Sequence, residues 1–311
     1  MLKSIAIAFM LWGSVSLASA PMAKTQAPGF YRFMLGDFEI TTLSDGTVAL
    51  PMNTLMLNTT QKKVESELKK FYLDSPTETS VNTFLINTGT KLVLVDAGAA
   101  SLFGPTLGKL VSNLKASGYT PDQIDEIYIT HLHNDHIGGL TNDGKVTFPN
   151  AIIRADQHDL DFWLSKENMD KAPEGMKPFF QGPMNVFLPL QKANKVKPFE
   201  GDTQLIDGIK AVQTHGHTAG HTVYVVESKG KKLILIGDLI HLGAVQFAHP
   251  EVTIQYDSNT KEAAIQRKKI FESVAKEGAI VGASHLSFPG VGHIQKEGKK
   301  FIWLPLNYSQ L

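Results

Sequence analysis

The chain has 311 residues, of which 42% are hydrophobic and 19% charged, a balance that is typical of a folded globular protein and excludes a disordered one. Lysine plus arginine number 30, as do aspartate plus glutamate, so no basic field favours nucleic acid as a partner. Cysteine is absent, which excludes disulfide bonds and thiolate metal ligands.

Residues 1–20 have the pattern of a secretory signal peptide. Lys3 supplies a positive start, Ile5 to Leu17 is an uncharged apolar run, and Ala18-Ser19-Ala20 fits a small-residue cleavage site. The apolar run is shorter than the ~20 residues that a membrane-spanning helix needs. We therefore expect a periplasmic or secreted mature protein with no membrane anchor.

After the signal we expect an N-terminal extension at 21–34 and then a single domain over 35–311. Apolar runs bounded by turn residues predict strands, and apolar residues at helical spacing predict helices. In the first half, Asp45-Gly46 is expected as a hairpin turn between two strands. Strands are expected at 33–35, 38–43, 48–50, 81–86, 91–95 and 126–130, and helices at 61–72 and 107–114.

The second half has a similar pattern. The Pro- and Gly-containing residues 165–182 are expected as a long irregular segment, which in a compact domain is usually functional or mobile. Strands are expected at 152–155, 209–213, 222–227, 232–236, 279–282 and 301–306, and helices at 157–164 and 261–276. The pattern favours the α+β class: two β-sheets packed together with helices outside, a four-layer αβ/βα sandwich of two similar halves.

Four metal-ligand side chains follow the apolar strand that ends near residue 130. They are His131, His133, Asp135 and His136, and they lie within six residues. Three imidazoles and a carboxylate suit a borderline divalent ion such as Zn²⁺. The alternative, a loop of solvated histidines, fits poorly with a position directly after a buried strand.

Three later segments also place ligand-type residues at strand ends. They are the turn 214–221 with its three histidines, Gly237-Asp238 after an apolar strand, and Ser284-His285 after another. Each segment alone is weak evidence for a metal site, because a histidine at a strand end is more often a hydrogen-bonded surface residue. Together they supply the ligands that the first cluster lacks for a site of two metal ions.

This series of motifs resembles the metallo-β-lactamase-fold hydrolase superfamily. The motifs are His-x-His-x-Asp-His at 131–136, His-Thr-x-Gly-His at 217–221, Gly237-Asp238 and the late His285. The resemblance implies two divalent metal ions, with zinc as the first choice. It assigns His131, His133 and His217 to one ion, Asp135, His136 and His285 to the other, Asp238 as the bridge, and Asp96 and His221 as supporting residues outside the ligands.

The second His turn, residues 214–221, departs from the family pattern at one position. His215 stands where many members have proline, so the turn offers a choice of ligand. His217 matches the family's ligand because it directly precedes Thr218-Ala219-Gly220.

The implied mechanism is hydrolysis by water that bridges two cations. Two cations lower the pKa of such a water from about 15.7 towards 7 and polarise the bond to be cleaved. Asp238 and Asp135 are the expected catalytic carboxylates, Asp238 as the bridge and Asp135 as a candidate proton donor to the leaving group.

Within the superfamily, the later part of the chain resembles the methyl parathion hydrolase-like branch. The segments that carry this resemblance are Gly237–His241, Ala244–Phe247, Val252–Asp257 and His285–Gly290. Members of this branch are exported bacterial hydrolases of aryl phosphotriesters, or of lactones and aryl esters. The resemblance places Phe103, Trp163, Phe180 and His241 along the substrate pocket, although core packing of the aromatics and a surface position of His241 are the alternatives.

We expect a hydrolase of lactones or aryl esters that acts on a small neutral hydrophobic or aromatic substrate, with organophosphate triester hydrolysis as a further activity. The alternatives are a dedicated organophosphorus hydrolase, a β-lactamase and a non-catalytic periplasmic metal-binding protein. Exposed aromatic residues would also suit a homodimer interface.

Overall fold

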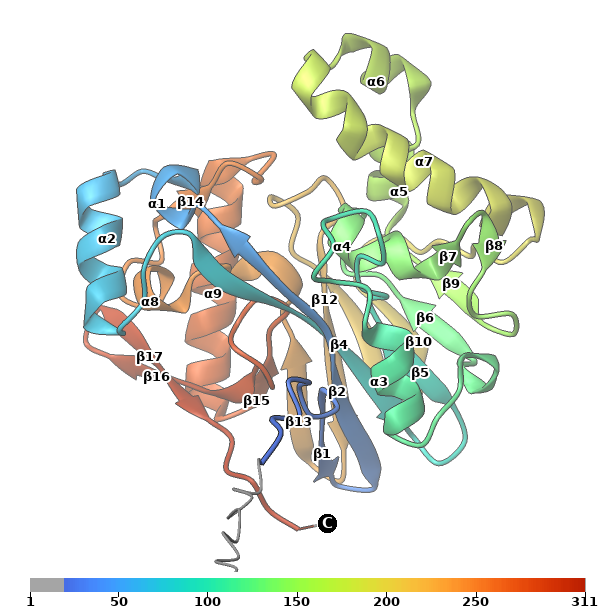
Figure 1. Ribbon diagram of the computed structural model, residues 1–311, viewed down its shortest axis with the longest axis horizontal. Coiled ribbons are helices and arrows are strands. Elements are labelled where there is room, and N and C mark those ends of the chain that lie inside the picture. Colours follow the sequence, from blue (N-terminus) through green and yellow to red (C-terminus); the bar gives the residue numbers. More distant parts are fainter. Residues whose placement is uncertain (1–19, 311) are drawn as a thin grey trace, which may run out of the picture.

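The computed structural model describes residues 20–310 (Figure 1). The expected signal peptide therefore lies, apart from Ala20, outside the described residues. Among the helices that are described, none is both long and apolar enough to cross a membrane.

Two large sheets form the centre of the molecule. In spatial order, the first sheet contains β1 (Phe30–Leu35), β2 (Phe38–Leu50), β4 (Thr77–Asn87), β5 (Leu92–Val95), β6 (Glu126–Tyr128) and β9 (Ile152–Arg154). The second contains β10 (Thr203–Ile206), β11 (Ile209–Gln213), β12 (Thr222–Ser228), β13 (Lys231–Leu235), β15 (Ile280–Gly282), β16 (Val291–Glu297) and β17 (Lys300–Pro305). Short pairs join β3 (Met56–Leu57) to β14 (Thr253–Ile254) and β7 (Thr141–Asn142) to β8 (Lys145–Val146).

Helices cover the outer faces of both sheets. On the side of the first sheet lie α3 (Leu110–Ala116), α4 (Asn134–Ile137), α5 (Gln157–Trp163), α6 (Lys166–Lys171) and α7 (Lys177–Lys192) (Figure 1). On the other side lie α1 (Met52–Leu55), α2 (Gln61–Lys70), α8 (Gly243–Gln246) and α9 (Thr260–Glu277) (Figure 1). Single 3₁₀ turns occur at η1 (Pro121–Gln123), η2 (Gly138–Leu140), η3 (Glu174–Met176) and η4 (Gly237–Leu239).

The buried apolar side chains divide into layers that match this arrangement. One cluster fills the space between the sheets, with Ile86 and Val95 from the first sheet and Val226 and Leu235 from the second. Separate clusters lie between the first sheet and α3, α5 and α7, and between the second sheet and α9. Because each face buries its own apolar set, the order helix, sheet, sheet, helix follows, and the predicted αβ/βα sandwich is confirmed.

Each sheet contains parallel neighbouring strands. In the first sheet β5 runs parallel to β6 and β6 to β9, and in the second β13 runs parallel to β15. Parallel neighbours end at the same edge of a sheet, and loops at that edge are the usual place for binding residues in such sheets. Expected site residues follow these strands: the ligands His131, Asp238 and His285 follow β6, β13 and β15, and the supporting residue Asp96 follows β5.

The structure corrects three local predictions. β1 begins at Phe30, so residues 30–34 belong to the first sheet and not to an N-terminal extension. Asp45-Gly46 is no hairpin turn, because β2 continues through it and pairs with β4 on both sides of a register shift between Ser44 and Gly46.

The third correction concerns residues 165–182, which are mostly helical rather than irregular, in α6, η3 and the start of α7. Pro178 is tolerated because it lies in the first turn of α7, where its missing N–H has no partner to lose. Gly182 lets α7 approach α4, since a Cβ there would lie 2.0 Å from Asn134 Oδ1. Tertiary packing therefore outweighs the helix-breaking composition.

Candidate metal centre

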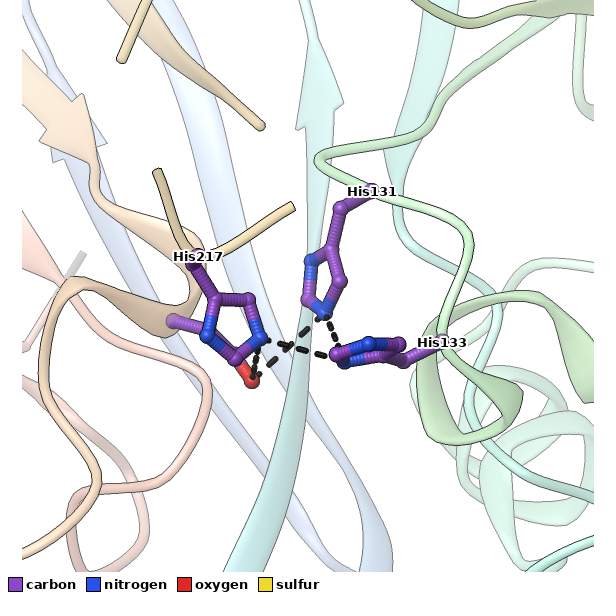
Figure 2. Close-up of side chains that lie close together, drawn as sticks. His131, His133 and His217 are labelled. Carbon is purple, nitrogen blue, oxygen red and sulfur yellow. Dashed lines mark hydrogen bonds and ion pairs between the residues drawn. The ribbon is translucent and has the colours of Figure 1, made fainter. Parts of the chain in front are cut away.

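The first His turn, residues 131–136, leaves β6 in extended conformation and ends in α4. His133 occupies the N-cap position of that helix with φ −70° and ψ 154°, and His136 lies in its single turn. The rings of His131 and His133 lie edge to face, and His131 Nε2 is 3.1 Å from His133 Nδ1. The extended exit from the strand thus directs both side chains into one buried space, as Figure 2 shows.

Asp96 supports this turn from behind. Its backbone has φ 62°, a left-handed conformation that is uncommon for a non-glycine residue and is often found at functional sites. One carboxylate oxygen accepts the Thr130 N–H at 2.8 Å, and the other accepts His136 Nδ1–H at 2.8 Å. Asp96 therefore fixes the ring of His136 and leaves His136 Nε2 directed at the site, the supporting role expected of it.

The second His turn lies between β11 and β12 and uses its three histidines differently. His217 is buried, and its Nε2 lies 3.1 Å from His133 Nδ1 (Figure 2). His221 lies behind the site, where its Nε2 accepts the Asp238 N–H at 3.1 Å and its Nδ1 is 2.9 Å from Thr214 Oγ1. His215 points away to Asp156, at 3.4 Å.

Asp238 lies at the centre of the cluster, in the 3₁₀ turn that follows β13. Gly237 precedes it with φ 51°, and a Cβ at Gly237 would lie 2.8 Å from His221 Nε2, so this tight turn requires glycine. Asp238 Oδ2 is 3.6 Å from His131 Nε2 and 3.3 Å from His217 Nε2. Oδ2 thus faces these two histidines, while Oδ1 remains for a second group of ligands.

The second group surrounds the other oxygen of Asp238. His136 Nε2 is 3.2 Å from Asp238 Oδ1, and His285 Nε2 is 3.1 Å from each of the two oxygens of Asp238. Asp135 Oδ2 completes this group at 3.6 Å from His136 Nε2 and 3.5 Å from His285 Nε2. His285 donates its other ring N–H to the backbone carbonyl of Ser80 at 2.9 Å, which fixes the ring. The structure therefore brings the seven expected ligands together in the two expected groups.

The donor set fits two divalent metal ions. Five imidazoles and two carboxylates face one buried space, whose members are His131, His133, His217 and Asp238 in one group and Asp135, His136 and His285 in the other. Although they lie 3.2 Å apart, His136 Nε2 and Asp238 Oδ1 are buried and form no hydrogen bond with any described residue, an arrangement that costs free energy unless a cation satisfies them. Each group offers the three or four N and O ligands that a zinc-type ion takes.

Asp238 and His131 are in the protonation states that metal binding requires. Burial opposes ionisation of Asp238, but the surrounding histidines outweigh it and hold the pKa of this carboxyl well below its ordinary value. Burial, followed by the charge of His136, lowers the pKa of His131 well below 6.5, so that this imidazole is neutral. An ionised carboxylate and a neutral imidazole are the forms that coordinate a cation. For His217, burial lowers the pKa, but the hydrogen bonds to Asp238 and Asp257 outweigh it and raise the pKa to about 9, so a cation has to displace a proton there.

Two buried aspartates act in the site without a local sequence signal. Asp257 accepts His217 Nδ1–H at 2.7 Å and so orients this ring. Asp159 accepts hydrogen bonds from Leu132 N–H at 2.9 Å in the first His turn and from the Thr218 hydroxyl at 2.9 Å in the second. Both are distant in sequence from the residues they hold. Asp257 is the last residue of Val252–Asp257, one of the segments that carry the resemblance, but no role was predicted for it.

A narrow pocket opens onto the cluster. Its cavity volume is about 30 Å³, and its walls include Val48, Leu50, Phe103, Phe179, Tyr256 and His241 in addition to ligands of both groups. Phe103 and His241 therefore lie where they were expected. His241 Nε2 is 3.0 Å from Asp238 Oδ2, and its ring stacks on His285 with centroids 5.3 Å apart.

The other two expected aromatics do not line this pocket. Trp163 is buried with its ring edge against His133, at a centroid distance of 5.2 Å, and Phe180 packs on Trp163 at 4.9 Å inside the hydrophobic core. Phe179 borders the pocket in place of Phe180. Since successive residues of a helix point about 100° apart, the helical structure of α7 explains the exchange.

A second, wider groove reaches the site from the side of α2, α8 and β16–β17. Its cavity volume is about 780 Å³, and His241 and His285 line its inner end. Apolar side chains such as Phe71, Phe288 and Trp303 line its outer part. The centre is therefore bordered by two cavities that share these two histidines.

Fold and centre together define a metal-dependent hydrolase. The profile of the Metallo-beta-lactamase superfamily matches residues 76–285, which is more than half of the chain. The chain belongs to this superfamily, as its motifs predicted.

Solved and curated relatives agree with this class. The hydrolase AbOPH of the beta lactamase superfamily is 39% identical, with a TM-score of 0.87 over 92% of this chain and 100% of that one. AidC, a dizinc quorum-quenching lactonase solved with a product, is 27% identical, with a TM-score of 0.84 over 91% of this chain and 99% of that one. An N-acyl homoserine lactonase of Bacillus sp is 27% identical over 177 residues, which are 57% of this chain and 62% of that relative.

Proposed function

We propose that this protein hydrolyses neutral lactones or aryl esters, with two zinc ions at the centre. The observation that carries the proposal is the position of Asp238, whose carboxylate lies between the two ligand groups next to an apolar, aromatic pocket. The similarity to AidC and to the Bacillus lactonase supports a lactone as the substrate class. The imidazole-rich ligand set supports zinc.

The residues of the chain have distinct parts in this reaction. Bound divalent ions would supply Lewis acidity and lower the pKa of water. Asp238 keeps the two groups of ligands in register, and the hydrogen bonds from His136 to Asp96 and from His217 to Asp257 hold the rings still. Asp135 is the more exposed carboxylate of the centre and borders the pocket, where it can pass a proton to the departing alkoxide or phenoxide.

The walls of the pocket favour a neutral substrate. Among the described residues that line it, none is lysine or arginine, so no fixed cation is available to hold a carboxylate or a phosphodiester. This composition disfavours β-lactams, which carry a carboxylate, and nucleic acids. Phe103, Phe179 and Tyr256 offer apolar contact and exclude water from the bond to be cleaved.

A phosphotriester is also neutral and fits the same walls, so organophosphate triester hydrolysis is the second activity that we propose. It rests on the resemblance to the methyl parathion hydrolase-like branch and on the aromatic lining of the pocket. A substrate panel ranks the two activities: the lactone and aryl ester values of kcat/KM are expected to exceed that for a paraoxon-type triester. The reverse order would make the protein a dedicated organophosphorus hydrolase.

The test of hydrolysis itself uses protein freed of metal by chelation and then reconstituted with Zn²⁺, Co²⁺ or Mn²⁺. We expect chelation to abolish turnover of lactones and aryl esters and metal to restore it, with nitrocefin left intact. Stoichiometric metal binding without turnover of any member of the panel would contradict the proposal and indicate a metal-binding protein. Sequencing the N-terminus of the exported protein would test our further proposal that residues 1–20 are removed.

A further inference from the structure

A second group of metal-ligand side chains lies outside the centre, on the far side of the second His turn. It consists of Asp156, His158 and His215, and we call it the outer cluster. Asp156 follows β9 at the N-cap of α5, His158 lies in the first turn of α5, and His215 comes from the turn after β11. The cluster thus joins the second His turn to the segment that connects the first sheet with its helices.

The ligand atoms of the outer cluster converge on one point. His158 Nδ1 is 2.9 Å from Asp156 Oδ1, and His215 Nε2 is 3.4 Å from Asp156 Oδ2. The two imidazole rings lie 5.0 Å apart between centroids. All three ligand atoms lie within 4.8 Å of one another.

The main centre provides an internal standard for these distances. There the ring nitrogens of His131, His217 and His285 lie between 3.1 and 3.6 Å from the oxygens of Asp238. The outer cluster shows a similar approach of imidazole nitrogens to one carboxylate, at 2.9 and 3.4 Å. Two imidazoles and one carboxylate are a donor set that binds zinc at sites where water takes the remaining position.

Burial and access also fit a metal site. Asp156 is 1% exposed, and the backbone N–H of His158 fixes one of its oxygens at 2.8 Å, so the carboxylate is held in place. The side chains of His158 and His215 are 55% and 28% exposed, so an ion and its water ligands can reach them from solvent. The carboxylate is thus anchored below two accessible imidazoles, whose hydrogen bonds to it a bound ion would replace.

We propose that Asp156, His158 and His215 form a third divalent-metal site, which binds a transition ion of the zinc type more weakly than the main centre and braces the second His turn against α5. The site has three protein ligands, one fewer than the group around Asp238 Oδ2, and it is open to solvent, which explains the weaker binding. The proposal does not depend on which substrate the main centre hydrolyses.

The test counts bound metal on the untagged, chelator-treated protein. Equilibrium dialysis against increasing Zn²⁺, read by elemental analysis, is expected to give two tight equivalents and a third, weaker one. His158→Ala, His215→Ala and Asp156→Asn are each expected to lose the third equivalent alone. His293→Ala, which removes a histidine outside both clusters, should keep all three.

A thermal shift provides a second readout that is independent of activity. Zinc above the second equivalent is expected to raise the Tm of the unaltered protein and of His293→Ala, and to leave that of His158→Ala unchanged. If His215→Ala disturbs the turn and loses more than one equivalent, His158→Ala decides, because it lies outside that turn and is exposed. Uptake of only two equivalents by the unaltered protein, or retention of the third by His158→Ala, would overturn the proposal.

Discussion

The two His-rich turns of the chain, 131–136 and 214–221, carry three histidines each and use them in different ways. In the first turn all three rings reach the main centre. In the second turn His217 alone does so, because His221 turns behind Asp238 and His215 turns outward to Asp156. Residue type therefore indicates a metal site, but the partner on the far side of each ring decides which histidine belongs to it.

The largest expected effect on activity comes from substituting the histidine of the second turn that reaches the main centre. His217→Ala should lower kcat/KM by more than ~100-fold, since it removes a ligand-type nitrogen and not merely its supporting partner, whose loss typically costs 10–100-fold. His215→Ala should lose less than ~10-fold, below that range, because its side chain faces Asp156. Steady-state kinetics on metal-reconstituted protein measures both, and the opposite order would move the ligand to His215.

The neighbouring residues Phe179 and Phe180 extend the comparison to the pocket. Phe180→Ala should lower the free energy of unfolding by about 3–5 kcal/mol, as expected for a buried aromatic in the core. Phe179→Ala, at the pocket wall, should instead raise KM with a smaller loss of stability. Urea unfolding and kinetics on the two variants separate these outcomes, and a KM effect confined to Phe180→Ala would restore Phe180 to the pocket.

Asp159 joins the two turns, and its titration offers a pH test. Burial raises the pKa of this carboxyl from 3.8 to about 6, despite the hydrogen bonds that it accepts. A group with a raised carboxyl pKa binds its proton more tightly in the folded state, so its stabilising effect is present below pH 3.8 and is lost as the pH rises through 6. For this shift the loss amounts to about 3 kcal/mol.

The measurement is urea unfolding of metal-free protein and of Asp159→Asn at several pH values. Between acid and neutral pH, the difference in unfolding free energy should move by about 3 kcal/mol in favour of the variant, which lacks the titrating group. A difference that stays constant with pH would show that folding does not shift the pKa of Asp159.

The smallest expected effect concerns the partner of His217. Asp257→Asn should weaken metal affinity by about 10–100-fold, because the carboxylate that orients the ring of His217 becomes a neutral amide. Competition with a chromophoric chelator measures the change. Asp161→Asn, on the exposed surface of α5, is the matched control, and equal affinities for the two variants would refute the role of Asp257.

The sequence predicted those features that depend on local patterns. Ligand-type residues directly after buried strands, such as His131 after β6 and Asp238 after β13, are visible in one dimension, and so is the alternation of strands and helices that defines the sandwich. Asp96 was visible for the same reason, since it ends an apolar strand.

The features that the sequence did not predict depend on tertiary packing. The prolines and glycines of residues 165–182 conceal the helical structure there, which packing on the first sheet stabilises. Phe180 was expected at the pocket from the family resemblance, but Phe179 borders the pocket instead. Asp159 and Asp257 touch the His turns from distant parts of the chain, so no spacing within the turns indicates them. A single sequence does not indicate hydrogen-bond partners that are far apart along the chain.

The most direct test of the main centre is anomalous diffraction at the zinc edge from crystals of the zinc-loaded protein. We expect two strong peaks, one bounded by His131, His133 and His217 and the other by Asp135, His136 and His285, with Asp238 between them. A single peak, or a peak bound through His215 or His221 in place of His217, would contradict the account.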